Sequence, residues 1–274
     1  MIQIFKKIRR KLLENNRLRS YSIYALGEVF LVVIGILLAL QFNNWNVERS
    51  NNERERWYLI NIVEDIEYQK GDLKDLQSDY KISIEIAQGI LKDFKRLGSF
   101  SKIDSLNEKI SDMLVADNFP NINNTDQELV NSGQQTLIKN KDLSIDVIDY
   151  YLFCNDNYID VKNNNDNIFY EDIYPTFSAL HQTNLLGIDL EDNSLDFEDE
   201  NTNIYIKRKL EDPENVLSML NALRKYILIN TFHLEMVEKT LKISLELDNP
   251  QTLSVLLGIS NLISKTYFWT LKNT

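Results

Sequence analysis

A single carboxylate lies inside the most apolar stretch of the chain. Residues 21–42 read YSIYALGEVFLVVIGILLALQF, and Glu28 is their one charged side chain. An ionised carboxylate at membrane depth is costly unless it is paired, protonated or able to snorkel to the interface. Glu28 could therefore carry protons or bind a cation of a partner protein. Alternatively, it could snorkel to the inner interface or pair with Arg17 or Arg19.

A second candidate site is the acidic run at residues 189–200, DLEDNSLDFEDE. When this run is aligned with an EF-hand loop, Asp189, Glu191, Asn193 and Glu200 fall on calcium-ligand positions. Ser194 stands where the EF-hand turn requires glycine. A solvated acidic loop is therefore the competing interpretation of this run.

Other catalytic and cofactor-binding patterns are missing from the sequence. The chain has 8 Gly, 1 Cys and 2 His, and no glycine-rich phosphate-binding motif. These counts argue against a nucleotide loop, a zinc site built from cysteines and a centre with several histidines. We expect no cofactor, no resident metal and no enzymatic activity. An enzyme with a dispersed carboxylate site is the remaining catalytic alternative. Cys154 is expected to be a buried small residue, and His233 is expected either to pack or to reach the surface.

The apolar run has the length of a membrane-spanning helix. Its 22 residues would extend roughly 33 Å, against about 30 Å for the bilayer core. Seven cations precede the run, and the positive-inside rule then predicts a cytoplasmic N-terminus: Lys6, Lys7, Arg9, Arg10, Lys11, Arg17 and Arg19. We expect a bacterial inner-membrane protein with a basic amphipathic cytoplasmic segment at 1–20, a transmembrane helix at 21–42 and a periplasmic domain at 43–274.

Small residues suggest how two such anchors could approach each other. Gly27, Gly35 and Ala39 share one face of the expected helix, as small residues do where transmembrane helices pack closely. Trp45 follows the span, where aromatic side chains occupy the membrane interface. We expect contact with membrane lipid, and either a homo-oligomer or a complex with a membrane protein partner.

The charge distribution agrees with this topology. The net charge is −11, but residues 1–49 carry +5 and residues 50–274 carry −16. A strongly acidic body disfavours nucleic acid as a partner.

The remaining chain has the pattern of an all-α protein. Apolar residues recur every seven positions from 59 to 94, which predicts a long helix over 54–97 with coiled-coil character, ended by Gly98. Further helices are expected at 101–116, 125–138, 142–162, 166–182, about 213–245 and 250–272, with a short strand at 204–206. The fold class predicted is an N-terminal transmembrane helix followed by a long helix and an antiparallel helical bundle.

Two segments resemble an uncharacterised family of membrane-anchored proteins of Bacteroidota. The first is KKIRRKLLENN followed by YALGEVFLVVIGILLALQFNNWN, which ends at Asn46, and the second is ELVNSGQQTLIKNKDLSIDVIDYY at 128–151. The resemblance implies an anchored location and no particular reaction.

We therefore expect a membrane-anchored periplasmic scaffold or partner-binding protein. A proton-coupled transducer subunit that uses Glu28 is the first alternative, and the dispersed-carboxylate enzyme is the second.

Overall fold

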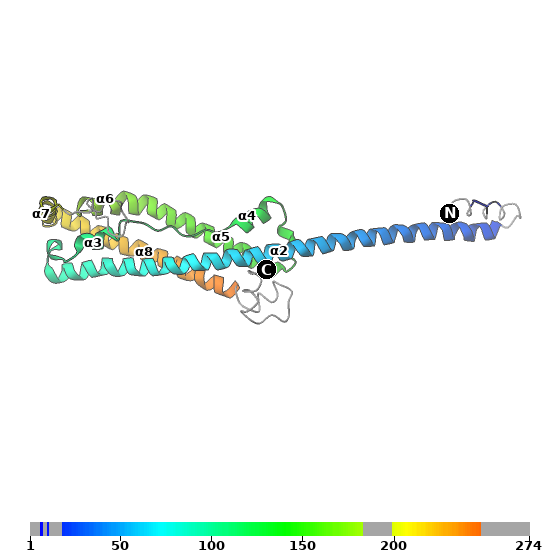
Figure 1. The fold of residues 1–274 in the computed structure, drawn as a ribbon, viewed down its shortest axis with the longest axis horizontal. Helices are drawn as coiled ribbons and strands as arrows, with labels where there is room; N and C mark the ends of the chain where they lie inside the picture. Colours follow the sequence, from blue (N-terminus) through cyan, green and yellow to red (C-terminus); the bar gives the residue numbers. More distant parts are fainter. Residues whose placement is uncertain (1–5, 8–9, 11–17, 183–198, 248–274) are drawn as a thin grey trace, which may run out of the picture. The chain divides into compact units, whose positions relative to one another are not determined.

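The computed structural model describes residues 6–7, 10, 18–182 and 199–247, and every regular element in them is helical (Figure 1). The predicted all-α class is therefore confirmed. The chain divides into two compact units, Met1–Trp57 and Tyr58–Thr274. The expected helix at 250–272 and most of the basic segment at 1–20 lie outside the described residues.

One helix, α2 (Leu18–Leu97), includes both the apolar run and the heptad segment. It ends where the sequence predicts, because Gly98 adopts a φ of 73° and its N–H binds the carbonyl of Phe94 at 2.8 Å. A left-handed residue at this position satisfies a terminal carbonyl of the helix, and glycine adopts that conformation without a Cβ clash.

The heptad face of α2 is buried inside the chain itself. Its buried members between residues 59 and 90 are Leu59, Ile62, Ile66, Gln69, Leu73, Leu76, Tyr80, Ala87 and Ile90. All of them except Gln69 belong to two hydrophobic clusters shared with other helices of the same chain. The coiled-coil pattern is thus used for packing within the bundle.

Two further long helical stretches complete the bundle. α5 (Lys141–Asn164) continues through the π-helical η3 (Asn165–Ile173) into α6 (Tyr174–Ala179), and α8 (Pro213–Leu247) follows later. Asp212 caps α8 through hydrogen bonds from the N–H groups of Glu214 and Asn215 at 2.9 and 3.3 Å.

Side-chain contacts show the directions of the three helices. Glu238 of α8 contacts Gln77 of α2, whereas Tyr226, earlier in α8, is hydrogen-bonded to Ser83, later in α2. Between α5 and α8 the hydrogen-bonded pairs run in opposite order, from Asn157 with Thr240 to Asn164 with His233. Figure 1 shows the three helices side by side, with α8 antiparallel to α2 and to α5, which run in the same direction.

Because α2 and α5 are parallel, the chain between them must return along the bundle. This crossover contains η1 (Phe100–Lys102), α3 (Leu106–Ser111), α4 (Asn124–Asn131) and η2 (Gln135–Leu137). The prediction of one helix at 101–116 is wrong, since residues 112–123 form no helix. The carbonyls of Asp117 and Pro120 and the N–H of Ile122 find partners on α2 instead.

A row of polar side chains on α2 holds the crossover. Tyr58 binds Glu128, and Asp65 accepts the N–H of Thr125 at 3.2 Å. The Gln69 amide donates to the carbonyl of Pro120 at 2.5 Å and accepts from the N–H of Ile122 at 2.7 Å. As the residue numbers on α2 increase, those of their partners in the crossover decrease. The crossover therefore runs antiparallel to α2.

The helix predicted at 142–162 is confirmed as α5, and the chain stays helical through the asparagine-rich stretch at 155–167. Asn157 donates to Thr240 Oγ1 at 3.1 Å, and Asn165 donates to the carbonyl of Asp117 at 2.7 Å. Both amides are buried. These tertiary hydrogen bonds outweigh the weak helix propensity of asparagine.

The strand predicted at 204–206 is also wrong. These residues lie within α7 (Glu200–Lys209), which Asp199 caps by accepting the N–H of Thr202 at 2.7 Å. Ile206 and Leu210 are the buried residues here. Their spacing of four is helical, and the apparent alternation at 204–206 includes only one buried side chain.

We expect Gln69→Leu to lower the free energy of unfolding by about 1–3 kcal/mol, because two backbone groups of the crossover lose their partners. Urea unfolding of the full chain in detergent, followed by circular dichroism, measures this change. Gln77→Leu is the matched control, since the Gln77 amide binds the exposed carboxylate of Glu238. Equal effects of the two substitutions would contradict the role assigned to Gln69.

Candidate functional site

The apolar part of α2 is exposed over its whole circumference. An 18-residue window of this helix has a mean hydropathy of 2.5, and none of the window is buried. The large side chains at 45% exposure or more between residues 23 and 42 are Ile23, Leu26, Val29, Phe30, Leu31, Val32, Val33, Ile36, Leu37, Leu38, Leu40 and Phe42. By length and composition this helix can cross a membrane.

Glu28 and the small residues lie on this exposed surface. Glu28 forms no ion pair with a described cation. A Cβ atom built on Gly27 or Gly35 would meet nothing within 4 Å. Ala39 is exposed as well, and Trp45 is 61% exposed. The small face is therefore open to a neighbouring helix.

The predicted basic segment is described only in part. Lys6, Lys7 and Arg10 are exposed, while Arg9, Lys11 and Arg17 lie outside the described residues. Arg19 belongs to α2 by its backbone. The pairing of Glu28 with Arg17 or Arg19 thus stays a prediction.

The candidate calcium loop also lies mostly outside the described residues. Asp189, Glu191 and Asn193 are not described, and Glu200 is the first residue of α7. Among the described residues, no group of three or more His, Cys, Asp or Glu side chains could hold a metal ion.

A layer of polar side chains crosses the middle of the bundle between its two hydrophobic clusters. We call this set the mid-bundle layer: Tyr80, Asp117, Asn164, Asn165 and His233. On α8, one cluster ends at Ile229 and the other begins at Val237, so His233 lies between them. The carbonyl of Asp117 accepts from Asn165 and, at 3.5 Å, from the Tyr80 hydroxyl.

The protonation states in this layer follow from burial. An amide nitrogen can only donate, so Nε2 of His233 accepts from Asn164 at 3.3 Å and the ring proton lies on Nδ1. Burial lowers the pKa of His233 to about 4, which keeps the ring neutral at pH 7. Burial and the nearby Asp79 raise the pKa of the Asp117 carboxyl. Burial also raises the pKa of Tyr80.

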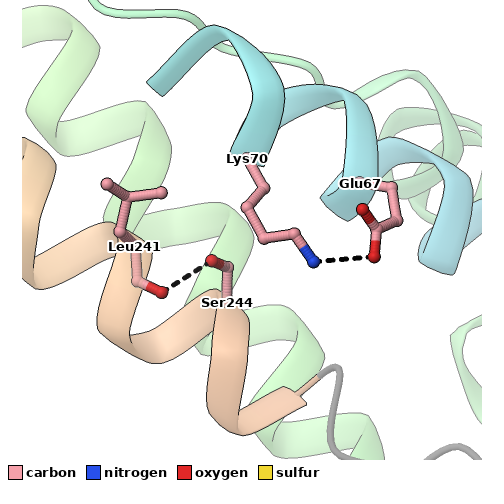
Figure 2. Close-up of polar contacts among 4 residues, drawn as sticks. All are labelled: Glu67, Lys70, Leu241 and Ser244. Atoms are coloured by element: carbon pink, nitrogen blue, oxygen red, sulfur yellow. Dashed lines mark hydrogen bonds and ion pairs between the residues drawn. The ribbon is translucent and has the colours of Figure 1, made fainter. Parts of the chain in front are cut away.

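A buried lysine of α2, Lys70, lies near the C-terminal end of α8 (Figure 2). Figure 2 shows Lys70 of α2 directed at Glu67, with Ser244 of α8 nearby. The Lys70 ammonium lies 2.7 Å from the Glu67 carboxylate, and the lysine side chain is 9% exposed. Ser244 donates its hydroxyl proton to the carbonyl of Leu241 at 2.8 Å. The serine proton is thus directed to its own helix, as in ordinary back-bonding.

The remaining chemically reactive side chains are packing residues. Cys154 is fully buried, and burial raises the pKa of its thiol to about 12. Such a thiol is protonated at pH 7 and is a poor nucleophile. His181 is buried too, and its Nδ1–H donates to the carbonyl of Phe177 at 2.6 Å.

The sequence interpretation missed the mid-bundle layer. Asn164 and Asn165 stand in a run that reads as a loop, while Tyr80 occupies a heptad position and reads as core. The polar residue at heptad position 69 indicates that α2 has polar neighbours, but it does not identify the members of this layer.

The fold and these sites define an all-α bundle protein with one apolar helix that can cross a membrane. The sequence matches, over residues 28–206, a family described as "Family of unknown function (DUF6090)". The match covers more than half of the chain, which therefore belongs to this family. No curated protein and no solved structure matches the chain.

The neutral His233 predicts a pH dependence of stability. Its pKa in the folded chain is about 4, below the ordinary 6.5, so the unfolded chain binds the proton first as pH falls. The free energy of unfolding should decrease between about pH 6.5 and 4, by up to about 3 kcal/mol.

His233→Gln keeps an acceptor for Asn164 and removes the titration. Urea unfolding of both proteins from pH 4 to 8 measures the difference, which isolates His233 from His181, another histidine with a lowered pKa. Parallel stability curves of the two proteins would show that His233 does not titrate as described.

Proposed function

We propose that the chain is a single-span anchored protein of the inner membrane of a Gram-negative bacterium, whose periplasmic body is a helical scaffold that binds partner proteins. The exposed apolar surface of α2 is the observation that carries this proposal. Each large apolar side chain left in water costs about 1.5–3 kcal/mol relative to burial, and lipid removes that cost.

Charge supports the proposed orientation. Cations cluster before the apolar run, and the residues after it are strongly acidic. The positive-inside rule then places the N-terminus in the cytoplasm and residues 43–274 in the periplasm. The similarity of the first 46 residues to anchored proteins of Bacteroidota supports the same assignment.

The body supports a binding role rather than catalysis. In the mid-bundle layer, the side chains of Tyr80, Asn164, Asn165 and His233 bond to one another or to the Asp117 carbonyl. These contacts specify helix register, as buried polar groups do in coiled coils. A scaffold in this position would meet lipid, a second copy through the face of Gly27, Gly35 and Ala39, or a membrane protein partner.

A fusion of alkaline phosphatase after residue 274 should be active, because this enzyme folds only outside the cytoplasm. The matched fusion after residue 20 should be inactive, and the full chain should remain in membranes washed with alkaline carbonate. Phosphatase assays on whole cells give the result. A stable but inactive fusion after residue 274 would overturn the orientation.

A proton-coupled transducer is the second candidate, because Glu28 is exposed on α2 without a described ionic partner. In that case Glu28→Gln should abolish the function of the complex at unchanged abundance, since the amide cannot release a proton. Growth or transport of a deletion strain complemented with each form measures this, and Glu48→Gln outside the span is the control. Full complementation by Glu28→Gln would exclude the transducer.

A further inference from the structure

The helix α5 has a second apolar face that the described chain leaves open. Ile145, Leu152 and Ile159 recur every seven residues and are 55%, 56% and 45% exposed. Ile148 lies between the first two and is partly exposed. The opposite face of α5 is buried in the core. A helix that packs on one side only needs one apolar face, so the second requires its own explanation.

An acidic row accompanies this apolar row at the same period. Asp142, Asp149 and Asp156 each stand three residues before one of the apolar residues, and all are exposed. None of the three forms an ion pair with a described cation. We call the two rows together the α5 seam. Lys162, further along the helix, is already bound to Asp166.

The α5 seam repeats one apolar position of a coiled-coil heptad, and Ile148 adds the second apolar position in the first heptad only. An apolar residue at every seventh position contacts a partner helix, and the charges beside it select the partner by complementarity. Three carboxylates on one edge, none of them ion-paired within the described part of the chain, repel acidic helices and attract basic ones.

We propose that the α5 seam binds an amphipathic helix of a partner protein, with an apolar stripe that covers Ile145, Leu152 and Ile159 and with Lys or Arg side chains that meet the acidic row. This inference rests on the proposed scaffold function and specifies the chemistry of its partner. Two observations support this proposal: the apolar row is continuous along one helix, and the acidic row beside it is complementary to a basic partner.

Another exposed apolar pair lacks this pattern and provides a control. Leu217 and Leu228 on α8 are 58% and 73% exposed. They are eleven residues apart, and the cation Arg224 lies between them in the sequence. This surface offers exposed leucine side chains without an acidic row.

The first test measures binding of a defined probe to the full chain in nanodiscs of zwitterionic lipid, with empty nanodiscs subtracted. The probe is a three-heptad peptide with Leu at positions a and d and Lys at e and g. The matched peptide carries Glu in place of Lys. The Lys peptide should bind at least ten-fold more tightly than the Glu peptide, and added salt should reduce this difference.

Variants of the chain locate the binding surface. The triple change Ile145→Ser, Leu152→Ser and Ile159→Ser should weaken binding of the Lys peptide at least ten-fold. Asp142→Asn, Asp149→Asn and Asp156→Asn together should remove the preference for Lys over Glu. Leu217→Ser with Leu228→Ser should change neither, and circular dichroism verifies that each variant is folded. Equal loss in the α8 variant would overturn the proposal.

The second test uses native membranes. A photo-crosslinking residue at position 152 should give a discrete adduct that the acidic-row variant loses, whereas position 228 should not. If adducts form elsewhere on the body but not at 152, the seam inference fails and the scaffold function stands. If no described surface position gives an adduct, the scaffold function fails. Lys-peptide binding that requires removal of residues 248–274 would show that the chain covers its own seam, and would overturn the inference.

Discussion

The hydrogen bonds from α2 to the crossover are the interaction on which the bundle topology depends. Parallel neighbours such as α2 and α5 need a connection as long as the bundle, and residues 112–123 of that connection have no helix to satisfy their backbone. A buried N–H or carbonyl without a partner is costly. Gln69 supplies both a donor and an acceptor, which explains why a polar residue occupies a heptad position at 1% exposure.

The sequence predicts best where a pattern is long or a terminus has a clear signal. The heptads of 59–94, Gly98 and the Asp212-Pro213 start of α8 all correspond to the structure. The predictions at 101–116 and 204–206 failed because contacts distant in sequence decide them. The backbone groups of Pro120 and Ile122, for example, bond to Gln69, 51 and 53 residues away, instead of to a helix of their own. Glu28 could be found from sequence, whereas the mid-bundle layer could not.

The residues matched to the family include contacts that hold the bundle together. The segment at 128–151, which carries the second resemblance, contains several of the contacts that fix the crossover. Gly133 has a φ of 67° after α4, and the N–H of Gln134 binds the carbonyl of Leu129 at 3.0 Å, which ends the helix. Tyr151 donates to Asp65 at 2.9 Å. Tyr151 thus joins α5 to α2, whereas Gly133 and Gln134 end α4.

The π-helical stretch η3 has a consequence for anything that lies along α5. A π turn holds more residues than an α turn, so side chains beyond Asn165 no longer continue the seven-residue register set before it. The surface that α5 presents in constant register therefore has a fixed length, from the helix start at Lys141 to Asn164. This surface is 24 residues long, or roughly 36 Å. A partner helix can keep in register with α5 only over about that length.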